Sequence, residues 1–576
     1  MENKIIADIF NEIAELLSVD ERPTSKFEVR AYQKAALTIS TLQEPIEDVY
    51  AKGGLKALME LPGVGKSIAG HIEEYLKTHR IEKYDELKKK YPIDMAALTS
   101  IQGMGAKKAI TLYRRLGIRN IDDLKKALSS HRIRKLEGFG EKSEEMIQKG
   151  LTLMESSGGR MLLGDALPVA EEIVRKLKES GLAREAMVAG SARRMRETVG
   201  DIDILVISGK QKEVMDFFTA LPSVDTVLVS GPTKTSVHLK MGLNCDLRVI
   251  EPESFGAAVQ YFTGSRDHNI QVRTIAVNKG YKLNEYGLFD KKGVNIGGIK
   301  EEGIYEALGM QWMPPEMREA RGEVQLAIKH KIPDLVKLKD LNGDLHTHTK
   351  ETDGANTLEE MANEAMRLGH EYIATTNHTK SLYIARGMND DQFVKYFKQV
   401  DKLNEKLKGK LTILKGAEVD ILKDGSLDLR DSTLEYMDCV VGAIHSSFKL
   451  DKKEMTKRII AALDSGLIHV LAHPTGREIN ERQAYEVDLE AVAETAARNK
   501  VALEINSFPN RLDLNDTNIM RVSGYNVLFS IDSDAHRTAN LSFLRYGIGT
   551  ARRGWLTKDR IINAKPLKEL LKYLKK

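Results

Sequence analysis

Three aspartates in the first half of the chain have the spacing of a metal site. Asp201 and Asp203 lie two residues apart in the β-prone run GDIDIL, so both side chains point to one face of the predicted strand. Asp246, in NCDLRVI, starts another β-prone run that can pair alongside. Carboxylates on one face repel one another unless a cation lies between them, and oxygen ligands suit Mg²⁺ or Mn²⁺. We expect two such ions, which suit in-line nucleotidyl transfer. A D-x-D pair alone is also typical of a solvated strand face.

A second set of residues with metal-ligand chemistry lies in the C-terminal half, where residues 341–576 hold eight of the 14 histidines. A lone histidine is usually an ordinary surface or core residue, and we interpret His370 and His469 as structural. Nine candidates at consecutive predicted strand ends favour a metal centre instead. Their mixed nitrogen and oxygen ligands suit Zn²⁺, Mn²⁺ or Fe. The nine are His346, His348, Asp353, His378, Glu418, His445, His473, Asp534 and His536.

The histidines and acids follow a regular series of predicted strands. Seven apolar, β-prone runs recur about every 30 residues, the length of a βα unit, with helix-like stretches between them. This pattern predicts a (β/α)7 barrel. Every run but the sixth carries a histidine or an acid near its C-terminal end, where barrel enzymes place their chemistry. The runs span 343–348, 372–378, 411–419, 439–445, 468–474, 501–507 and 527–536.

A Gly-x-Gly element recurs in the N-terminal part, as LPGVGKSIA (61–69), IQGMGAKKA (101–109) and LEGFGEKSE (136–144). Two glycines before a helix let the backbone approach a phosphate and present N–H groups at the positive end of the helix. The alternative is tight helix packing without a ligand. Residues 101–140 hold ten Lys/Arg against three acids, which favours DNA-backbone binding. The third copy is the weakest, because Glu141, Glu144 and Glu145 would repel phosphate. The expected DNA contacts are Gly63, Gly65, Gly103, Gly105, Lys107 and Lys108.

Composition bounds the class of protein. The chain has 576 residues, of which 42% are hydrophobic and 30% charged, so several globular domains are expected and fibrous or disordered classes are excluded. Its net charge of +4 is an average over a basic segment and nearly neutral parts. Cys245 and Cys439 build neither a disulfide framework nor a cysteine zinc site. Without a signal peptide or a membrane-spanning run, we expect a cytoplasmic protein with no membrane partner.

The first half resembles family X DNA polymerases, including DNA polymerase beta. The resemblance rests on G-S-x-R-R before D-I-D (190–203) and on YFTGS (261–265). It implies that the three aspartates hold the metals. Further residues would bind the triphosphate: Arg160, Gly190, Ser191, Arg194 and Gly200. Others would flank the incoming nucleotide: Tyr261, Phe262, Gly264, Asn269 and Arg273.

Two positions depart from the family X pattern. His71 stands where the family has a Schiff-base lysine for deoxyribose-phosphate lyase chemistry, and an imidazole cannot form that imine. Lys66 and Lys83 are nearby in sequence as substitutes. Arg266 replaces an acidic residue that the family often has after the turn, which could alter how the incoming base is held.

The C-terminal part resembles the PHP (polymerase and histidinol phosphatase) domain, and every ligand position of its motifs is filled. The resemblance implies up to three ions, with Glu418 bridging two of them and a metal-bound hydroxide attacking a phosphoester. The first ion would take His346, His348, Glu418 and Asp534. The second would take Glu418, His445 and His473, and the third would take Asp353, His378 and His536.

Together the resemblances predict a multidomain chain of α+β and α/β folds. They predict a monomeric bacterial-type polymerase that fills short gaps in DNA repair. This polymerase would be fused to a 3′–5′ exonuclease, which could also cleave DNA at abasic sites. Its partners would be gapped or primer–template DNA and deoxynucleoside triphosphates. Two alternatives stay open: a PHP domain that is a small-molecule phosphatase, and a non-catalytic scaffold for DNA ends. The domains would be helix-hairpin-helix DNA-binding (1–85), helix-hairpin-helix fingers (86–155), nucleotidyltransferase palm (156–255), thumb (256–315), linker (316–335) and PHP barrel (336–576).

Overall fold

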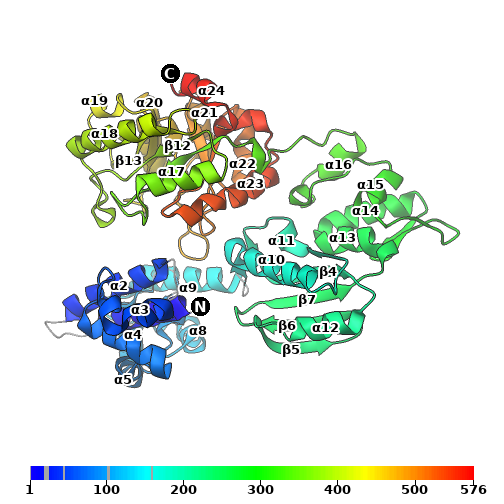
Figure 1. The fold of residues 1–576 in the computed structure, drawn as a ribbon, viewed down its shortest axis with the longest axis horizontal. Coiled ribbons are helices and arrows are strands. Elements are labelled where there is room, and N and C mark those ends of the chain that lie inside the picture. The colour runs from blue at the N-terminus through cyan, green and yellow to red at the C-terminus, as the bar shows by residue number, and fades with distance from the viewer. Residues whose placement is uncertain are drawn as a thin grey trace. The chain divides into compact units, whose positions relative to one another are not determined.

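The computed structural model describes residues 2–18, 25–42, 46–99, 101, 104–156 and 160–575. The chain forms two compact units, Met1–Ser157 and Gly158–Lys576 (Figure 1). Within the described residues, no helix has both the length and the apolar character needed to cross a bilayer.

The first unit is helical, as predicted. One apolar cluster, from Ile6 on the first helix to Leu151 on the last, joins all of its parts. The helices are α1 (Glu2–Leu17), α2 (Ser25–Thr41), α3 (Ile46–Met59), α4 (Lys66–Thr78), α5 (Glu82–Lys90), α6 (Met95–Thr99), α7 (Ala106–Leu116), α8 (Ile121–Ser129) and α9 (Gly140–Ser156).

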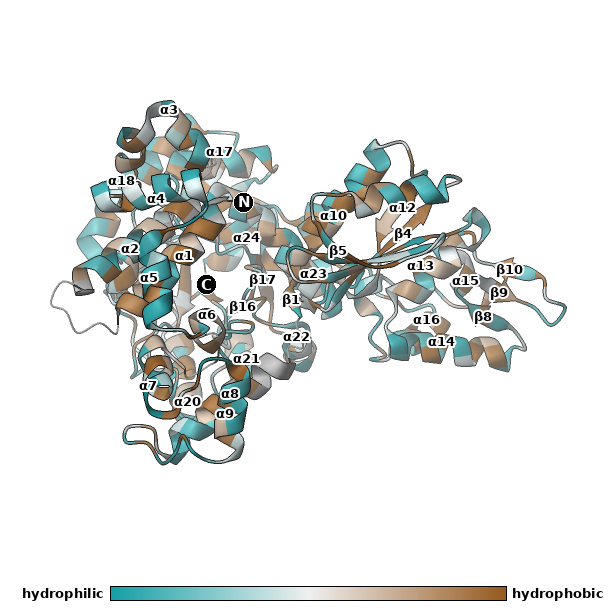
Figure 2. Ribbon diagram, turned by 90° about the horizontal axis from the view of Figure 1, so that it is seen from below, coloured by the Kyte–Doolittle hydropathy of each residue, from teal (hydrophilic) through white to brown (hydrophobic). Residues whose placement is uncertain are grey.

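The second unit begins with a five-stranded sheet of order β2-β4-β7-β6-β5. Its strands are β2 (Glu185–Val188), β4 (Asp201–Ile207), β5 (Val224–Ser230), β6 (Lys234–Leu239) and β7 (Asn244–Val249). Helices α10 (Leu163–Glu179) and α12 (Gln211–Thr219) cover one face, on which Ile202, Ile204 and Val206 of β4 are buried (Figure 2). The alternate residues of β4 lie on the other face, which is covered only in part by α13 (Phe255–Thr263).

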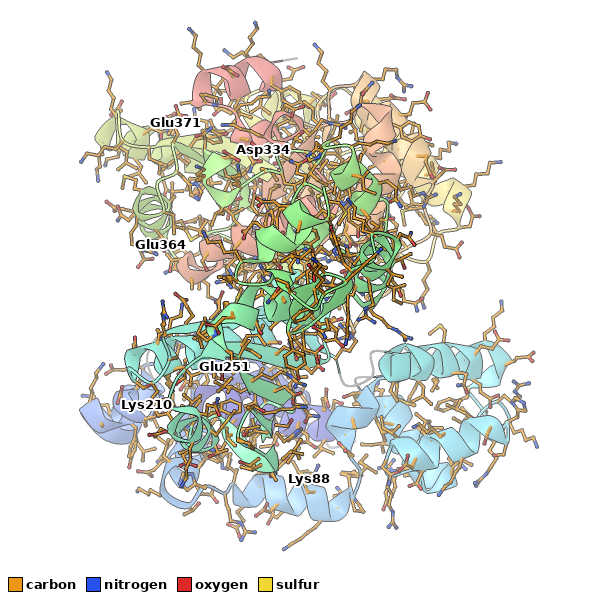
Figure 3. All side chains as sticks on the ribbon, turned by 90° about the vertical axis from the view of Figure 1, so that its right-hand side faces the viewer. Lys88, Lys210, Glu251, Asp334, Glu364 and Glu371 are labelled. Carbon is orange, nitrogen blue, oxygen red and sulfur yellow. The ribbon has the colours of Figure 1, made fainter. Side chains whose placement is uncertain are left out.

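A smaller α/β region follows, built on the helices α13 and α14 (Arg266–Asn278) and a sheet of order β10-β9-β8. Within the predicted linker, helix α16 (Glu323–Ile328) packs Val324 and Ala327 into the core of this region. Asp334 follows that helix and is labelled in Figure 3. The remaining elements of this region are β8 (Lys282–Asn284), β9 (Gly287–Phe289), β10 (Asn295–Gly297) and α15 (Glu301–Ala307).

The C-terminal part is a parallel barrel, which confirms the predicted (β/α)7 architecture. Seven strands pair in chain order, and a bridge between Thr347 and Ala535 joins the first to the last. Helix α24 (Leu567–Leu574) packs Leu570 and Leu574 against apolar side chains inside the barrel. The strands are β11 (Gly343–Thr347), β12 (Tyr372–Thr375), β13 (Thr412–Asp420), β14 (Cys439–Ala443), β15 (Val470–Leu471), β16 (Ala502–Asn506) and β17 (Phe529–Asp532).

Helices pack around the outside of this barrel and bury the outward-facing side chains of its strands. They are α17 (Leu358–Arg367), α18 (Asp390–Lys406), α20 (Lys452–Asp464), α21 (Leu489–Arg498), α22 (Asp516–Val522) and α23 (Leu544–Arg553). Because all strands are parallel, their C-terminal ends meet at one rim, where the predicted ligands lie.

Candidate active sites

The three palm aspartates lie together on the partly open face of the five-stranded sheet. Strands β4 and β7 pair in parallel with Asp203 opposite Asp246, and Asp201 shares the face of Asp203. Burial, followed by the charges of Asp201 and Asp246, raises the pKa of Asp203 to about 7. Their mutual repulsion is the condition under which a cation is favoured between carboxylates.

Asp246 is oriented by two residues of the neighbouring strand β6. The Lys234 ammonium lies 2.7 Å from its Oδ2 atom, and the Ser236 hydroxyl donates to Oδ1 at 2.6 Å. Burial favours the neutral carboxyl, but these partners hold the pKa of Asp246 below its usual range. The sequence analysis did not identify either residue.

The aspartates open into a cleft of about 860 Å³ beside helices α13 and α14. Two of the aspartates, Asp201 and Asp203, line it. Gly200 lies at its edge, where a Cβ atom would come 3.2 Å from Nη1 of Arg160. Arg196, Arg266 and Ile270 also line the cleft. The predicted nucleotide-binding residues that line it are Arg160, Gly190, Ser191, Arg194, Tyr261, Phe262, Gly264, Asn269 and Arg273.

The Gly190-Ser191 turn has the features of a ligand cradle. Gly190 has φ +66°, and a Cβ atom there would lie 2.5 Å from Oδ2 of Asp203, so glycine is required twice over. The buried hydroxyl of Ser191 has no hydrogen-bond partner. A buried polar atom without a partner is costly, which fits a bound anionic group as its acceptor.

Arg194 is held in place from two sides. Its Nη1 atom donates to the Thr263 carbonyl at 2.5 Å, and its Nε atom lies 3.0 Å from Glu319. Arg553, on α23 of the barrel, lies 2.9 Å from the same carboxylate oxygen of Glu319. Arg553 also donates to the backbone carbonyl of Arg194 at 2.8 Å. The barrel therefore contacts the loop that carries a predicted triphosphate ligand.

Arg193 takes a different course from its neighbour. Both of its terminal nitrogens lie 2.8 Å from the Glu301 carboxylate, and Nη1 also donates to the Thr263 hydroxyl. These bonds engage Arg193 with helices α13 and α15, and Arg193 is not among the residues that line the cleft.

The barrel ligands converge on Glu418, a buried residue of β13. Five imidazoles surround its carboxylate. Nitrogens of three of them lie close: His378 Nδ1 at 2.8 Å, His473 Nε2 at 3.0 Å and His445 Nε2 at 3.2 Å. His346 and His348 approach at 3.4 and 3.6 Å. Burial opposes the charge of Glu418, but the surrounding histidines hold its pKa well below its usual range.

The ligand atoms form three overlapping groups, close to the three predicted ion sites. His348, which was assigned to the first ion, also joins the third group. His378, which was assigned to the third ion, also lies with Glu418. The groups are His346, His348 and Asp534; His378, Glu418 and His445; and His348, Asp353, His378 and His536. His473 contacts the second group through Glu418.

Several ring nitrogens point toward the cluster without a hydrogen-bond partner, among them Nε2 of His346 and both nitrogens of His348. The 2.8 Å contact between His378 and Glu418 also lacks hydrogen-bond geometry. Burial and neighbouring imidazoles lower the pKa of His348 to about 3, and burial lowers that of His473 to about 4. The neighbouring carboxylates instead raise the pKa of His378 to about 10 and that of His445 to about 9. Imidazole nitrogens beside carboxylates are ligands that fit Zn²⁺, Mn²⁺ or Fe.

Two acids that the sequence analysis missed fix the ligand rings. Glu504 lies 2.7 Å from Nδ1 of His346, and Asp420 lies 3.1 Å from Nδ1 of His445. Such contacts orient a ligating imidazole and select its tautomer. Glu504 belongs to β16, the sixth run, which was expected to carry no histidine or acid near its C-terminal end. Glu504 was missed because it lies in the middle of that strand.

Two ligands also have backbones of the left-handed region, His473 with φ +28° and Asp534 with φ +53°. Such conformations cost energy in non-glycine residues and cluster at functional sites. At His473 the conformation is supported by a buried bond, in which its N–H donates to the Glu504 carboxylate at 2.6 Å. Glu504 therefore orients the ring of one ligand, His346, and holds the backbone of another.

The two histidines interpreted as structural lie apart from the ligands. His370 and His469 precede strands β12 and β15 and so lie at the opposite end of the barrel. His469 accepts a hydrogen bond from the Val440 N–H at 2.9 Å, in keeping with its structural interpretation.

In the helical unit, the first two Gly-x-Gly elements open helices as expected. Gly65 and Gly105 are the N-cap residues of α4 and α7, and neither supplies a side-chain cap. Gly63 has φ +83°, which favours glycine in the turn before α4. Their helix N–H groups are therefore available to a phosphate. Gly103 lies outside the described residues, and Lys107 and Lys108 begin α7.

The third element differs from its sequence interpretation in one respect. Glu144 is only 3% exposed, with contacts to His131 at 2.9 Å and Arg134 at 2.5 Å. Its charge is thus compensated inside the fold and does not face a ligand. At the predicted lyase position, His71 stacks on Tyr32 with ring centroids 6.1 Å apart.

Four family models match the chain: a helix-hairpin-helix domain over 1–81, a SAM-like helix-hairpin-helix tandem over 95–152, the DNA polymerase beta thumb over 258–319 and the PHP domain over 344–508. The DNA polymerase/3′-5′ exonuclease PolX of Bacillus subtilis (strain 168) is 34% identical over 582 residues, covering 100% of both chains.

Two further relatives match only parts of the chain. A probable phosphatase of Syntrophotalea carbinolica is 28% identical over 230 residues, which are 38% of this chain and 90% of the phosphatase. DNA polymerase lambda of Rattus norvegicus is 24% identical over 328 residues, 51% of this chain and 53% of that polymerase.

The folds, the aspartate centre of the palm and the histidine-rich centre of the barrel define a family X polymerase of the DNA polymerase beta type, fused to a PHP phosphoesterase domain. Because the similarity to the Bacillus protein runs the full length of both chains, this chain belongs to the bacterial PolX family. The resemblances drawn from the sequence are thereby confirmed.

Divalent ions should stabilise the barrel, since they bind only the folded ligand cluster. An ion at a hundredfold excess over its Kd adds about 2.7 kcal/mol to the free energy of unfolding. Calorimetry of the metal-depleted chain should show a higher unfolding temperature with Zn²⁺ or Mn²⁺. Glu418→Gln should reduce this increase in unfolding temperature. Asp201→Ala with Asp203→Ala should keep the part of the increase that comes from ions bound to the barrel. No shift with Zn²⁺, Mn²⁺ or Fe would contradict the assignment.

Proposed function

We propose that the chain is a DNA-directed DNA polymerase that fills short gaps during DNA repair in the cytoplasm, joined to a metal-dependent 3′–5′ exonuclease that trims 3′ ends. The observation that carries the polymerase half is a single cleft lined by Asp201, Asp203 and the Gly190-Ser191 turn. Its substrates would be gapped or primer–template DNA and deoxynucleoside triphosphates. Cleavage at abasic sites is a further reaction within the reach of the same hydrolytic centre.

In the proposed polymerase reaction, Asp201, Asp203 and Asp246 would hold two Mg²⁺ or Mn²⁺ ions. When bound, such ions lower the pKa of the primer 3′-hydroxyl and neutralise charge on the phosphates. The Ser191 hydroxyl and the guanidinium groups of Arg160 and Arg194 bind the triphosphate. Lys234 and Ser236 hold Asp246 in its ionised, oriented state, so that it can accept the proton of the attacking hydroxyl.

In the proposed exonuclease reaction, the nine barrel residues would hold up to three ions, which would supply a nucleophile and neutralise charge on the scissile phosphate. The Glu418 carboxylate lies near His346 and His348 as well as near His378 and His445. Glu504 and Asp420 keep His346 and His445 in the ligating tautomer. The Tyr396 hydroxyl lies 2.7 Å from the hydroxyl of Thr375 at the end of β12 and 3.4 Å from that of Thr349 in the loop after β11, so it helps to position that loop.

A small-molecule phosphatase is the second candidate for the barrel, and the Syntrophotalea relative favours it. That similarity leaves out the polymerase half and the helix-hairpin-helix unit, which would supply DNA to the barrel. The intact aspartate and histidine sets argue against a scaffold without catalysis.

Variants at the two sites should separate two activities. Asp201→Ala with Asp203→Ala should abolish extension of a labelled primer and spare its degradation, because only the palm loses its ligands. His346→Ala should do the reverse. Gel analysis of a gapped duplex checks both, with circular dichroism as the folding control. Loss of both activities from either change in a folded protein would contradict two independent sites. Hydrolysis of small phosphomonoesters but not of DNA would favour the phosphatase.

The basic helix-hairpin-helix segment should contribute to DNA affinity. Replacing Lys107, Lys108 and Arg114 by Ala should weaken binding and flatten its salt dependence, since each phosphate ligand that is removed lowers the slope of log K against log salt by about 0.9. Fluorescence anisotropy at several salt concentrations measures the slope. An unchanged slope would remove this segment from the interface.

The barrel should also influence nucleotide binding through Arg194. Arg553→Ala removes the donor to the Arg194 carbonyl and one partner of Glu319, which still pairs with Arg194 and Arg196. Because Arg194 is then held less firmly, the KM for deoxynucleoside triphosphate should rise about tenfold, which corresponds to about 1.4 kcal/mol. Arg545→Ala is the matched control. It breaks a 2.7 Å ion pair between the same helix and Glu171 of the palm without touching Arg194. Equal KM values for both variants in steady-state primer extension would refute the coupling.

A further inference from the structure

Two apolar side chains next to the barrel ligands stand fully in solvent. Tyr383 is 89% exposed and Ile384 is 92% exposed, more than any other large hydrophobic residue in the part of the chain that the structure describes. Neither is needed to fill the core, because the neighbouring Ala385, at 3% exposure, is the residue of that turn that packs inward. Adjacent exposed apolar residues indicate an interaction surface when a partner of suitable chemistry comes close.

The pair lies beside the metal ligands. It forms the short turn Tyr383–Ala385, five residues beyond His378. Five residues span at most about 17 Å, even fully extended. A strand of stacked nucleotides advances about 3.4 Å per base, so the turn lies within about five nucleotides of a phosphate at the ligand cluster.

The turn is displayed on a loop that is fixed at both ends. Thr379 and Met388 form a bridge, and the Met388 N–H donates to the His378 carbonyl at 2.9 Å. A Cβ atom on Gly387 would lie 1.9 Å from the Thr379 carbonyl oxygen, so the two ends of the loop touch. The Ser381 N–H donates to Asp428 at 2.9 Å. A preorganised loop loses little entropy when a ligand packs on it.

The charge of the loop suits a polyanion. Residues 379–388, TKSLYIARGM, contain Lys380 and Arg386 and no acid, and the Lys380 ammonium lies 3.4 Å from Asp390, just after the loop. Arg386 is exposed, and its guanidinium contacts the carbonyl of Thr352, one residue before the ligand Asp353. Phosphates that pass the loop toward the ligands would therefore meet the positive charge of Arg386. Bases would meet the apolar side chains of Tyr383 and Ile384.

We propose that Tyr383, with Ile384 beside it, is a stacking platform for unpaired bases near the 3′ end of the strand that the barrel hydrolyses. The platform would make frayed or single-stranded 3′ ends the preferred substrate, because a paired base cannot offer its face to the ring. This inference rests on the proposed exonuclease function. Stacking of a base on an aromatic ring depends little on base identity, so the preference concerns strand state rather than sequence.

The first test compares exonuclease kinetics of the full chain on a single-stranded 3′ overhang. Tyr383→Ala should raise KM about tenfold and change kcat less than twofold, whereas Tyr383→Phe and Tyr383→Trp should keep the native KM. Hydrolysis of bis(p-nitrophenyl) phosphate, which has no base to stack, should be unchanged. Tyr525→Ala is the matched control, since Tyr525 is an exposed tyrosine that precedes β17 at the opposite end of the barrel.

The second test observes stacking directly. A 2-aminopurine base near the 3′ end of the overhang, bound in EDTA so that no hydrolysis occurs, should be quenched by the native chain and less by Tyr383→Ala. If Tyr383→Ala keeps the native KM and the native quenching, Tyr383 is not a stacking platform for bases. The exposed pair would then be a surface for a protein partner. Loss of small-ester hydrolysis in that variant would also overturn the platform, because the residue would then serve the ligand cluster. Quenching by a native chain that degrades no DNA would refute the exonuclease function and not the platform.

Discussion

The carboxylate of Glu418 is the constraint around which the barrel is organised. It is buried in the barrel, and an isolated buried charge is strongly unfavourable. The chain compensates it with imidazoles from four strand ends, of which His378, His445 and His473 come within 3.2 Å. Removing the compensation would leave a bare charge, and removing Glu418 would leave a set of buried bases. Each half of the arrangement therefore offsets the cost of burying the other.

The same barrel has a second role outside its rim. Helix α23 packs against the palm, and a Cβ atom on Gly549 would lie 2.7 Å from the side chain of Met195. Arg477 adds a 2.7 Å contact to Glu197. Because residues 194–197 follow the Gly190-Ser191 turn, the shape of the polymerase cleft depends partly on a domain with different chemistry. This dependence gives a physical reason for one chain to carry both.

The period of a strand and the position of its C-terminal end were sufficient to predict which candidate ligands lie close together. Asp201 and Asp203 share a face by the period of two, as do His346 and His348. The supporting residues could not be predicted in this way. Lys234 and Ser236 act across the β6–β7 pair, whose register the sequence does not specify. Glu504 of β16 acts on His346 of β11, a strand with which it is not paired. The burial of Glu144 likewise depends on Arg134, a contact within a turn that the acidic run alone does not reveal.

The two centres differ in ligand atoms, and this difference bears on how one molecule could run both reactions. The palm offers oxygen alone, from three carboxylates, which suits ions that keep water and bind phosphate, such as Mg²⁺. The barrel offers mainly imidazole nitrogen, which binds later transition ions more tightly than carboxylate oxygen does. A transition ion that saturates the barrel at low concentration would leave the palm aspartates free to bind Mg²⁺. Ligand softness, more than distance, would then keep synthesis and degradation under separate metal control.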